Sequence, residues 1–248
     1  MDKEHITSRP PYRSNSKPKQ TPLIDALVFD IETVPLRSEE YSNTQNELVQ
    51  RRLATVAQRK VPAGYVGVVP KTMFDYEAEE DKIKGTDPYL AKIVCIGLYY
   101  PRTGQRLALT NESEKVILDS FWDQIKGYTG VFISYNGIRF DVPFIIKRSI
   151  YHGVKATNMS FLQHLKYNAY PPHYDVMLQL CGRETPYSLK QACDFFGIPS
   201  PKEGTVHAAN VAEAYYEGRI QEIAEYCLRD LEGTYQLYDK VRLYTIGT

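Results

Sequence analysis

The sequence predicts an α/β fold with a mixed five-stranded sheet flanked by helices. Short apolar runs that are typical of buried strands alternate with helical patterns as far as residue 180, and the pattern from Ser188 onward is helical. The segment Pro101-Arg102-Thr103-Gly104 is a turn between two of these runs, which indicates an antiparallel hairpin. Strands that come first, alternate with helices and lead into a helical tail favour this class.

The first strand is expected at 23–32, an apolar run that ends in acidic residues. The hairpin supplies the next two strands, and Pro143 supports a helix that begins at Asp141. The remaining expected elements are strands at 92–100, 105–110, 131–135 and 174–180 and helices near 113–126 and over about 141–152. The helical tail is expected to break at Pro199–Gly204. The last helix of the tail has a stripe that faces the core, made of Ile220, Ile223, Cys227, Leu231, Thr234 and Tyr238.

Residues 1–22 are polar and proline-rich, with a local charge of +3, and are expected to form a disordered tail. Residues 23–248 are expected to form a single domain that contains an insertion at about 37–90. Within this insertion, Thr44 and Glu47 have capping-box spacing, and Val49, Leu53 and Val56 follow at helical spacing. The insertion is therefore expected to be part helix and part loop.

The composition narrows the functional classes. The 248 residues include 30 Lys+Arg and 30 Asp+Glu, so no global field attracts nucleic acid, which argues against a passive nucleic-acid-binding protein. We expect no membrane association and no secretion signal, because no apolar run approaches a membrane span and the N-terminus lacks a hydrophobic stretch. The four cysteines are far apart in the sequence and are predicted to be buried free thiols. Together these features predict a cytoplasmic protein.

Asp30 and Glu32 are two positions apart at the end of the first strand, so their side chains share a face. Two carboxylates so placed repel one another unless a cation or a proton lies between them, and Mg²⁺ or Mn²⁺ suits their hard oxygens. Solvated acids at a strand end are the simpler alternative. Asp141 starts a helix after a later strand, where capping is again an ordinary role for an acid.

Two Tyr-x-x-x-Asp pairs occur on the last helix, namely Tyr226 with Asp230 and Tyr235 with Asp239. Residues four apart point the same way from a helix, so each pair could present a hydroxyl beside a carboxylate. Helical geometry does not choose between them.

The order of these acids resembles the three motifs of the DEDD family of 3′–5′ exonucleases, in its tyrosine-bearing subgroup. The resemblance is greatest to the proofreading exonuclease domain of family B DNA polymerases, and it covers about 25–248 with 37–90 matching poorly. The stretch 135–145 (Tyr-Asn-Gly-Ile-Arg-Phe-Asp-Val-Pro-Phe-Ile) is the most specific match. The context of Tyr226 and Asp230 fits the third motif, which selects this pair over Tyr235 and Asp239. The fold implied is the ribonuclease H-like (DnaQ-like exonuclease) fold.

The resemblance also implies roles for these residues. Asp30 would bridge two ions of Mg²⁺ or Mn²⁺, Glu32 and Asp230 would hold the ion that binds the attacking water, and Asp141 would serve the second ion. Tyr226 would orient the nucleophile. The positions that match nucleic-acid contacts near the 3′ end are Thr33, Asn136, Phe140, Ser188 and Leu189. A basic stripe of Arg139, Lys147, Arg148 and Lys155 is either a phosphate-facing surface or a solvated helix face.

The implied reaction is two-metal-ion hydrolysis of phosphodiester bonds from the 3′ end of single-stranded nucleic acid, DNA more than RNA. The protein would be free-standing, or would act in trans with a polymerase or a DNA repair protein. Two alternatives stay open: a 3′–5′ exoribonuclease of the same fold, and a non-catalytic module that binds nucleic-acid ends.

Overall fold

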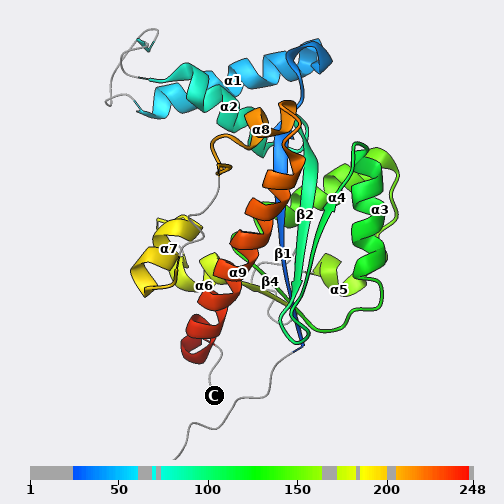
Figure 1. Cartoon of the computed structure of the whole chain (residues 1–248). Coiled ribbons are helices and arrows are strands. Elements are labelled where there is room, and N and C mark those ends of the chain that lie inside the picture. Colours follow the sequence, from blue (N-terminus) through cyan, green and yellow to red (C-terminus); the bar gives the residue numbers. More distant parts are fainter. Residues whose placement is uncertain are drawn as a thin grey trace, which may run out of the picture.

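The computed structural model describes residues 25–60, 69–70, 74–163, 172–182, 185–199 and 205–245. The predicted mixed five-stranded α/β sheet is confirmed, with strand order β3-β2-β1-β4-β5 (Figure 1). Strand β1 pairs antiparallel with β2, which pairs antiparallel with β3, and β4 and β5 continue from β1 in parallel. The strand bounds are Ala26–Pro35 (β1), Ala91–Tyr100 (β2), Gln105–Thr110 (β3), Val131–Ser134 (β4) and His173–Asp175 (β5).

Helices cover both faces of the sheet (Figure 1), and the side chains of β1 alternate between the two faces. Leu27, Phe29 and Ile31 face the layer of α3 (Glu114–Gln124), α4 (Asp141–His152) and α5 (Met159–Leu162). Ala26 and Val28 face the other layer. That layer contains α6 (Val176–Cys181), α7 (Leu189–Phe196), α8 (Val211–Tyr216) and α9 (Ile220–Thr245). The even-numbered residues of β1 therefore lie on the α9 side.

The strand predicted over 174–180 is wrong beyond Asp175, because the chain turns into α6 at Val176. The side chain of Asp175 caps this helix by accepting a hydrogen bond from the Leu178 N–H at 3.1 Å. A short apolar run such as 176–181 does not distinguish a strand from a helix by its pattern alone. Here the Asp175 cap favours the helix.

Residues between β1 and β2 form η1 (Ser38–Glu40), α1 (Asn43–Lys60) and α2 (Tyr76–Thr86), which lie at one end of the sheet around a small apolar cluster of their own (Figure 1). The capping box lies two residues earlier than predicted. Ser42 and Gln45 exchange hydrogen bonds at the start of α1, in place of Thr44 and Glu47. The tail predicted for 1–22 lies outside the described residues.

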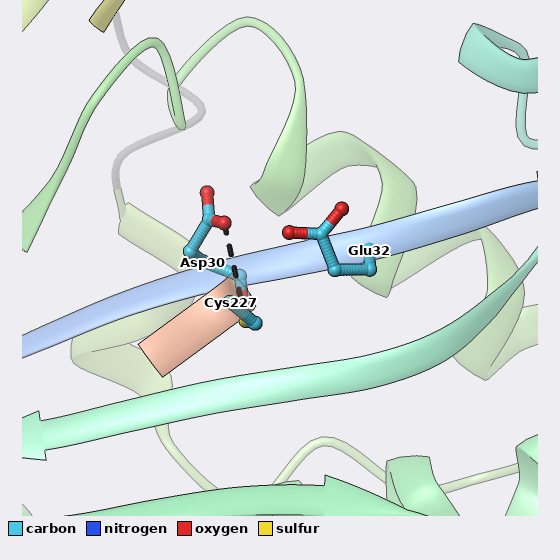
Figure 2. A group of neighbouring side chains, drawn as sticks. All are labelled: Asp30, Glu32 and Cys227. Carbon is cyan, nitrogen blue, oxygen red and sulfur yellow. Dashed lines mark hydrogen bonds between the residues drawn. The ribbon is translucent and has the colours of Figure 1, made fainter. Parts of the chain in front are cut away.

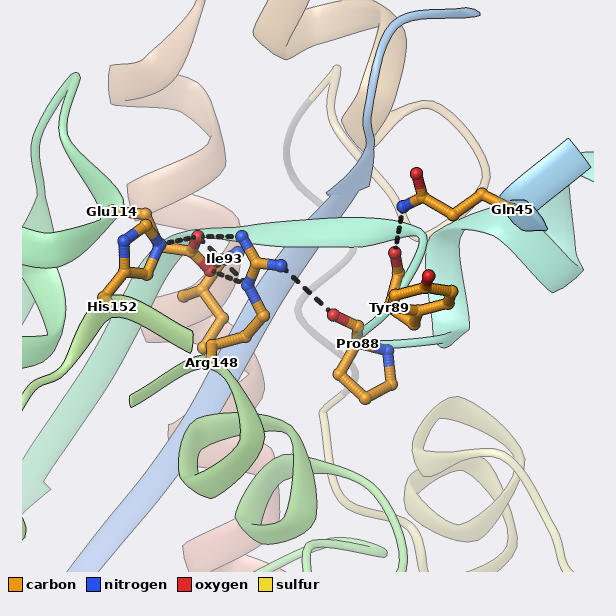
Figure 3. A network of polar contacts seen from close by, with 7 residues as sticks. All are labelled: Gln45, Pro88, Tyr89, Ile93, Glu114, Arg148 and His152. Carbon is orange, nitrogen blue, oxygen red and sulfur yellow. Dashed lines mark hydrogen bonds and ion pairs between the residues drawn. The ribbon is translucent and has the colours of Figure 1, made fainter. Parts of the chain in front are cut away.

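The predicted basic stripe needs a correction at Arg148. Its guanidinium is buried and forms an ion pair with Glu114 of α3, and it also donates to the Pro88 carbonyl at 3.2 Å (Figure 3). Glu114 also accepts from the Ile93 N–H at 2.8 Å and contacts His152 at 2.7 Å. Arg148 therefore joins α4 to α3 and to the segment before β2, and does not belong to a solvated helix face.

All four cysteines are buried free thiols, as predicted. Among the described residues, no helix combines the length and the apolar character that crossing a lipid bilayer requires.

Candidate active site

Asp30 and Glu32 project from the same side of β1, on the face that α9 covers (Figure 2). Glu32 is buried and Asp30 is half-buried. A register shift between Glu32 and Thr33 interrupts the pairing with β2 directly after the second acid. Such an irregularity bends a strand locally, and is common where a strand must direct side chains to a site.

Asp141 reaches β1 from the start of α4. Its Oδ1 atom accepts a hydrogen bond from the Ile31 N–H at 3.0 Å, and its carboxyl group shares a hydrogen bond with that of Asp30. Asp141 is thus in the first turn of α4, and its side chain also crosses to the strand that carries the other two acids. At 1% exposed, it is also not a solvated acid.

Asp175 holds the loop that delivers Asp141, a role that was not predicted from the sequence. Its two carboxylate oxygens accept from the Asn136 N–H and the Ile138 N–H, each at 3.0 Å. Asn136 has a positive φ of 67°, a conformation that such anchoring stabilises. One sequence signal could have indicated this role. Asp175 is an acid at the carboxyl end of β5, which is parallel to β4, and parallel strands end at the same edge of a sheet.

Tyr226 and Asp230 come from α9 and lie beside the β1 acids. The Tyr226 hydroxyl donates a hydrogen bond to Asp230, and both side chains interact electrostatically with Glu32. The second pair lies elsewhere: Tyr235 packs against Tyr99 with ring centroids 5.5 Å apart, and Asp239 pairs with Arg242. Of the two pairs, Tyr226 with Asp230 is the one that lies beside the acids of β1.

Burial disfavours the charged forms of all four carboxyl groups, and the neighbouring acids add to this effect at Asp30 and Glu32. Burial, and then the charge of Asp141, raise the pKa of Asp30 well above its usual range, and burial followed by the charge of Asp230 does the same for Glu32. Burial raises the pKa of Asp141 to about 7 and that of Asp230 to about 6. A cation placed among these groups would reverse the shifts, since it favours the charged forms.

The donor set fits a hard cation. Asp30, Glu32 and Cys227 place ligand atoms within 4.8 Å of one another (Figure 2). The Cys227 thiol is held by a hydrogen bond with Cys95 and by burial, which raise its pKa well above the usual range, so it stays protonated. Carboxylate oxygens are therefore the ligands that this cluster offers, which suits Mg²⁺ or Mn²⁺ better than zinc.

The predicted nucleic-acid contacts fall into two groups. Thr33, Asn136 and Phe140 are next to the acids: the Thr33 hydroxyl donates to the Gly85 carbonyl at 2.7 Å, and Phe140 is half-buried. Ser188 and Leu189 begin α7, where Ser188 caps the helix and Leu189 packs against the apolar cluster under α9. A hydrogen bond of 2.7 Å from the Tyr135 hydroxyl to the Tyr187 carbonyl connects the two groups.

This fold and this cluster of acids define an α/β protein with a buried group of carboxylates at β1, α4 and α9. A protein-family model described as a predicted 3′–5′ exonuclease related to the exonuclease domain of PolB matches residues 89–247, and the chain belongs to this family. The predicted resemblance to the exonuclease domain of family B polymerases is thereby confirmed. Strand β1, with Asp30 and Glu32, precedes the matched stretch.

The chain is also similar to the uncharacterized protein MJ0365 of Methanocaldococcus jannaschii. The two are 31% identical over 167 residues, which cover 62% of this chain and 88% of the relative.

Proposed function

We propose that this protein is a divalent-metal-dependent 3′–5′ exonuclease that removes nucleotides from the 3′ end of single-stranded DNA. The observation that carries the proposal is the convergence of Asp30, Glu32, Asp141, Asp230 and Tyr226 from three separate elements, in a chain that belongs to a family of predicted 3′–5′ exonucleases. We assign the four acids as ligands of two ions of Mg²⁺ or Mn²⁺, on a ribonuclease H-like fold.

When bound, the ions would lower the pKa of a water molecule and neutralise charge on the transferring phosphoryl group. The chain itself supplies the means of holding them. Asp141 is oriented by the Ile31 N–H, and the rigid strand β1 fixes the spacing of Asp30 and Glu32. Without bound cations, four carboxylates would repel a phosphodiester, so substrate binding depends on the metal.

Tyr226 positions the nucleophile in this proposal. Burial, and then the charges of Glu32 and Asp230, raise the pKa of its hydroxyl, so the group stays protonated at neutral pH. Asp230 accepts its hydrogen bond, which fixes the phenol oxygen as an acceptor for a water proton. Tyr226 therefore orients a water molecule and does not act as a base.

The strand end would be held by Thr33, Asn136 and Phe140 beside the acids and by Ser188 and Leu189 at α7. Small polar groups bind sugar and phosphate, and an aromatic ring can pack on an unstacked base without sequence preference. We propose that the enzyme acts alone, or on ends left by a polymerase or a repair protein in trans.

Degradation of a 5′-labelled single-stranded DNA oligonucleotide in Mg²⁺ or Mn²⁺ tests this proposal, beside its RNA counterpart. We expect a ladder that shortens from the 3′ end and is lost with EDTA. Asp30→Ala and Asp230→Ala should abolish the ladder while the protein stays folded. Asp239→Ala is the matched control on α9, because this acid pairs with Arg242 away from the cluster, and it should retain activity.

The outcomes separate the alternatives. Faster shortening of the RNA would replace DNA with RNA as the substrate. Binding of both oligonucleotides without cleavage of either would favour a non-catalytic module that holds nucleic-acid ends. Retained cleavage in Asp30→Ala would refute the assigned site.

A further inference from the structure

Two adjoining hollows lie along α4, and one of their walls belongs to the segment between β1 and β2. The hollows, of about 500 Å³ and about 420 Å³, share Asp87, Pro88, Tyr89 and Lys147 in their linings, and together they are called the groove. The first hollow reaches Arg139 and Phe140, and the second reaches Ile150 and Tyr151.

Both walls of this groove begin beside the acids. On one wall, Phe140 directly precedes Asp141. On the other wall, Thr86 follows Gly85, whose carbonyl accepts the hydrogen bond from Thr33, and Thr33 directly follows Glu32. A strand whose 3′ end lies at the acids therefore finds the groove at its next nucleotides.

The far part of the groove follows one face of α4. Phe140, Pro143, Lys147 and Tyr151 recur at intervals of three or four residues, so they lie on the same side of the helix. From Phe140 to Tyr151 the helix rises about 16 Å. At the spacing of about 3.4 Å per nucleotide of a stacked strand, this length accommodates about five nucleotides.

The groove has the charge and the surface that a single strand needs. Its charged lining residues are Asp87 and four cations, of which Arg52 pairs with Asp87 and Arg148 pairs with Glu114. Lys147 is exposed, and Tyr89 and Tyr151 are 51% and 73% exposed. Exposed aromatic rings beside cations are the combination that binds bases and phosphates of single strands.

We infer that this groove holds the nucleotides that precede the 3′ end, with Lys147 at the phosphate backbone and Tyr89 stacked on a base. The inference rests on the proposed function and deepens it, because it assigns the path of the substrate strand to a surface that the segment between β1 and β2 completes. Most of that segment precedes residue 89, where the family match begins.

Fluorescence anisotropy of a labelled eight-nucleotide DNA strand, with Ca²⁺ in place of Mg²⁺, measures binding independently of catalysis. We expect Tyr89→Ala and Tyr89→Leu to weaken binding about fivefold or more, since both remove the stacking ring. Lys147→Gln should also weaken binding and lower the slope of log K against log salt concentration by about 0.7. Controls are Lys115→Gln on α3 and Tyr244→Ala on α9, exposed residues outside the groove.

The ratio of kcat/KM for the eight-nucleotide strand to that for a dinucleotide then tests the path during hydrolysis. We expect the ratio to fall in the Tyr89 and Lys147 variants and to be unchanged in the two controls. If Phe195→Ala, at an exposed ring on α7, lowered the ratio while the groove variants did not, the strand would run over α7 and the inference would be wrong. Weaker binding in the groove variants of a protein that cleaves nothing would keep the groove assignment and refute the exonuclease. Unchanged binding in the groove variants of an enzyme that cleaves DNA would refute the groove assignment and keep the exonuclease.

Discussion

Gly97 and Cys227 face one another so closely that a Cβ atom on Gly97 would lie 2.6 Å from the Cys227 Sγ atom. The same Cβ would lie 2.9 Å from Cδ1 of Leu231. Gly97 is the partner of Asp30 in the β1–β2 ladder. The missing side chain therefore allows α9 to approach the sheet at the point where Tyr226 and Asp230 must meet the acids of β1.

Gly97→Ala should weaken both the fold and the site. The added methyl group has to displace α9 or force its side chains out of their rotamers, which costs about 1–3 kcal/mol of unfolding free energy. Urea denaturation measures this loss, and we expect hydrolysis to fall more than tenfold because α9 carries Tyr226 and Asp230.

Gly85→Ala is the matched control for this substitution. Its added Cβ would meet nothing closer than Pro35 at 3.9 Å, and Gly85 is helical. Alanine should therefore leave stability unchanged or raise it by up to about 1 kcal/mol. If Gly97→Ala behaved like Gly85→Ala in both assays, the close approach of α9 would not be what positions the site.

Asp175→Ala should impair metal binding at a site that Asp175 does not touch. The substitution leaves the N–H groups of Asn136, Ile138 and Leu178 without their acceptor, which costs about 2–4 kcal/mol in total. The loop that leads to Asp141 then loses its anchor. We expect a lower melting temperature, a lower kcat and a higher Mg²⁺ concentration for half-maximal activity.

Asp175→Asn distinguishes positioning from simple stability. Its amide offers one acceptor oxygen in place of two, so it should lie between the wild type and Asp175→Ala in the Mg²⁺ requirement. Asp119→Ala, which removes an exposed acid from α3, should change neither quantity. A lower melting temperature with an unaltered Mg²⁺ requirement would show that Asp175 only stabilises the fold.

The metal-free protein should lose stability as pH rises. Carboxyl groups in the unfolded chain titrate near pH 4, whereas burial raises the pKa of Asp230 to about 6 and that of Asp141 to about 7 in the fold. The folded state therefore binds more protons, and its stability is greatest below about pH 4 with respect to these groups and falls through about pH 7. Thermal unfolding in EDTA at a series of pH values measures this decline, and Mg²⁺ should offset it.

Asp30→Asn should separate stability from activity in the same assay. An uncharged amide removes both the cost of burying a charge and the repulsion with Asp141 and Glu32, which together raise the pKa of Asp30, so the variant should melt at a higher temperature than the wild type in EDTA at pH 8. It should also lack hydrolytic activity, since a proposed metal ligand is lost. A variant less stable than the wild type under these conditions would contradict the repulsion on which the metal assignment depends.

The sequence could predict those features of the site that depend on local periodicity. Asp30 and Glu32 share a face because of the two-residue period of a strand, and Asp141 follows a strand at the start of a helix. The choice of Tyr226 over Tyr235 needed the motif context, because the helical period fits both. Each of these predictions uses residues that are close together in the chain.

The features that the sequence could not predict depend on distant partners. Asp175 holds Asn136 from 39 residues away, and Arg148 pairs with Glu114 across 34 residues. Helical spacing alone placed Arg148 on a basic stripe, since a cation on a helix is exposed unless another element supplies an acid. The strand predicted beyond Asp175 was wrong for a different and local reason: Asp175 caps a helix through the Leu178 N–H, and a short apolar run alone does not distinguish a strand from a helix.

The ion pair of Glu114 with Arg148 gives a last prediction, since it is buried and Glu114 also holds the Ile93 N–H. Glu114→Ala should cost about 3–5 kcal/mol of unfolding free energy, because it leaves the Arg148 guanidinium buried without its carboxylate. Glu114→Leu combined with Arg148→Met should cost less than the two single changes together, which a double-mutant cycle in urea would show. Breaking the exposed pair of Lys115 with Asp119 should cost at most about 1 kcal/mol.

Arg148→Met should also leave the salt dependence of DNA binding unchanged, in contrast to Lys147→Gln, because a guanidinium neutralised by Glu114 has no charge to offer a phosphate. A salt slope that fell in Arg148→Met as much as in Lys147→Gln would return Arg148 to the phosphate-facing surface.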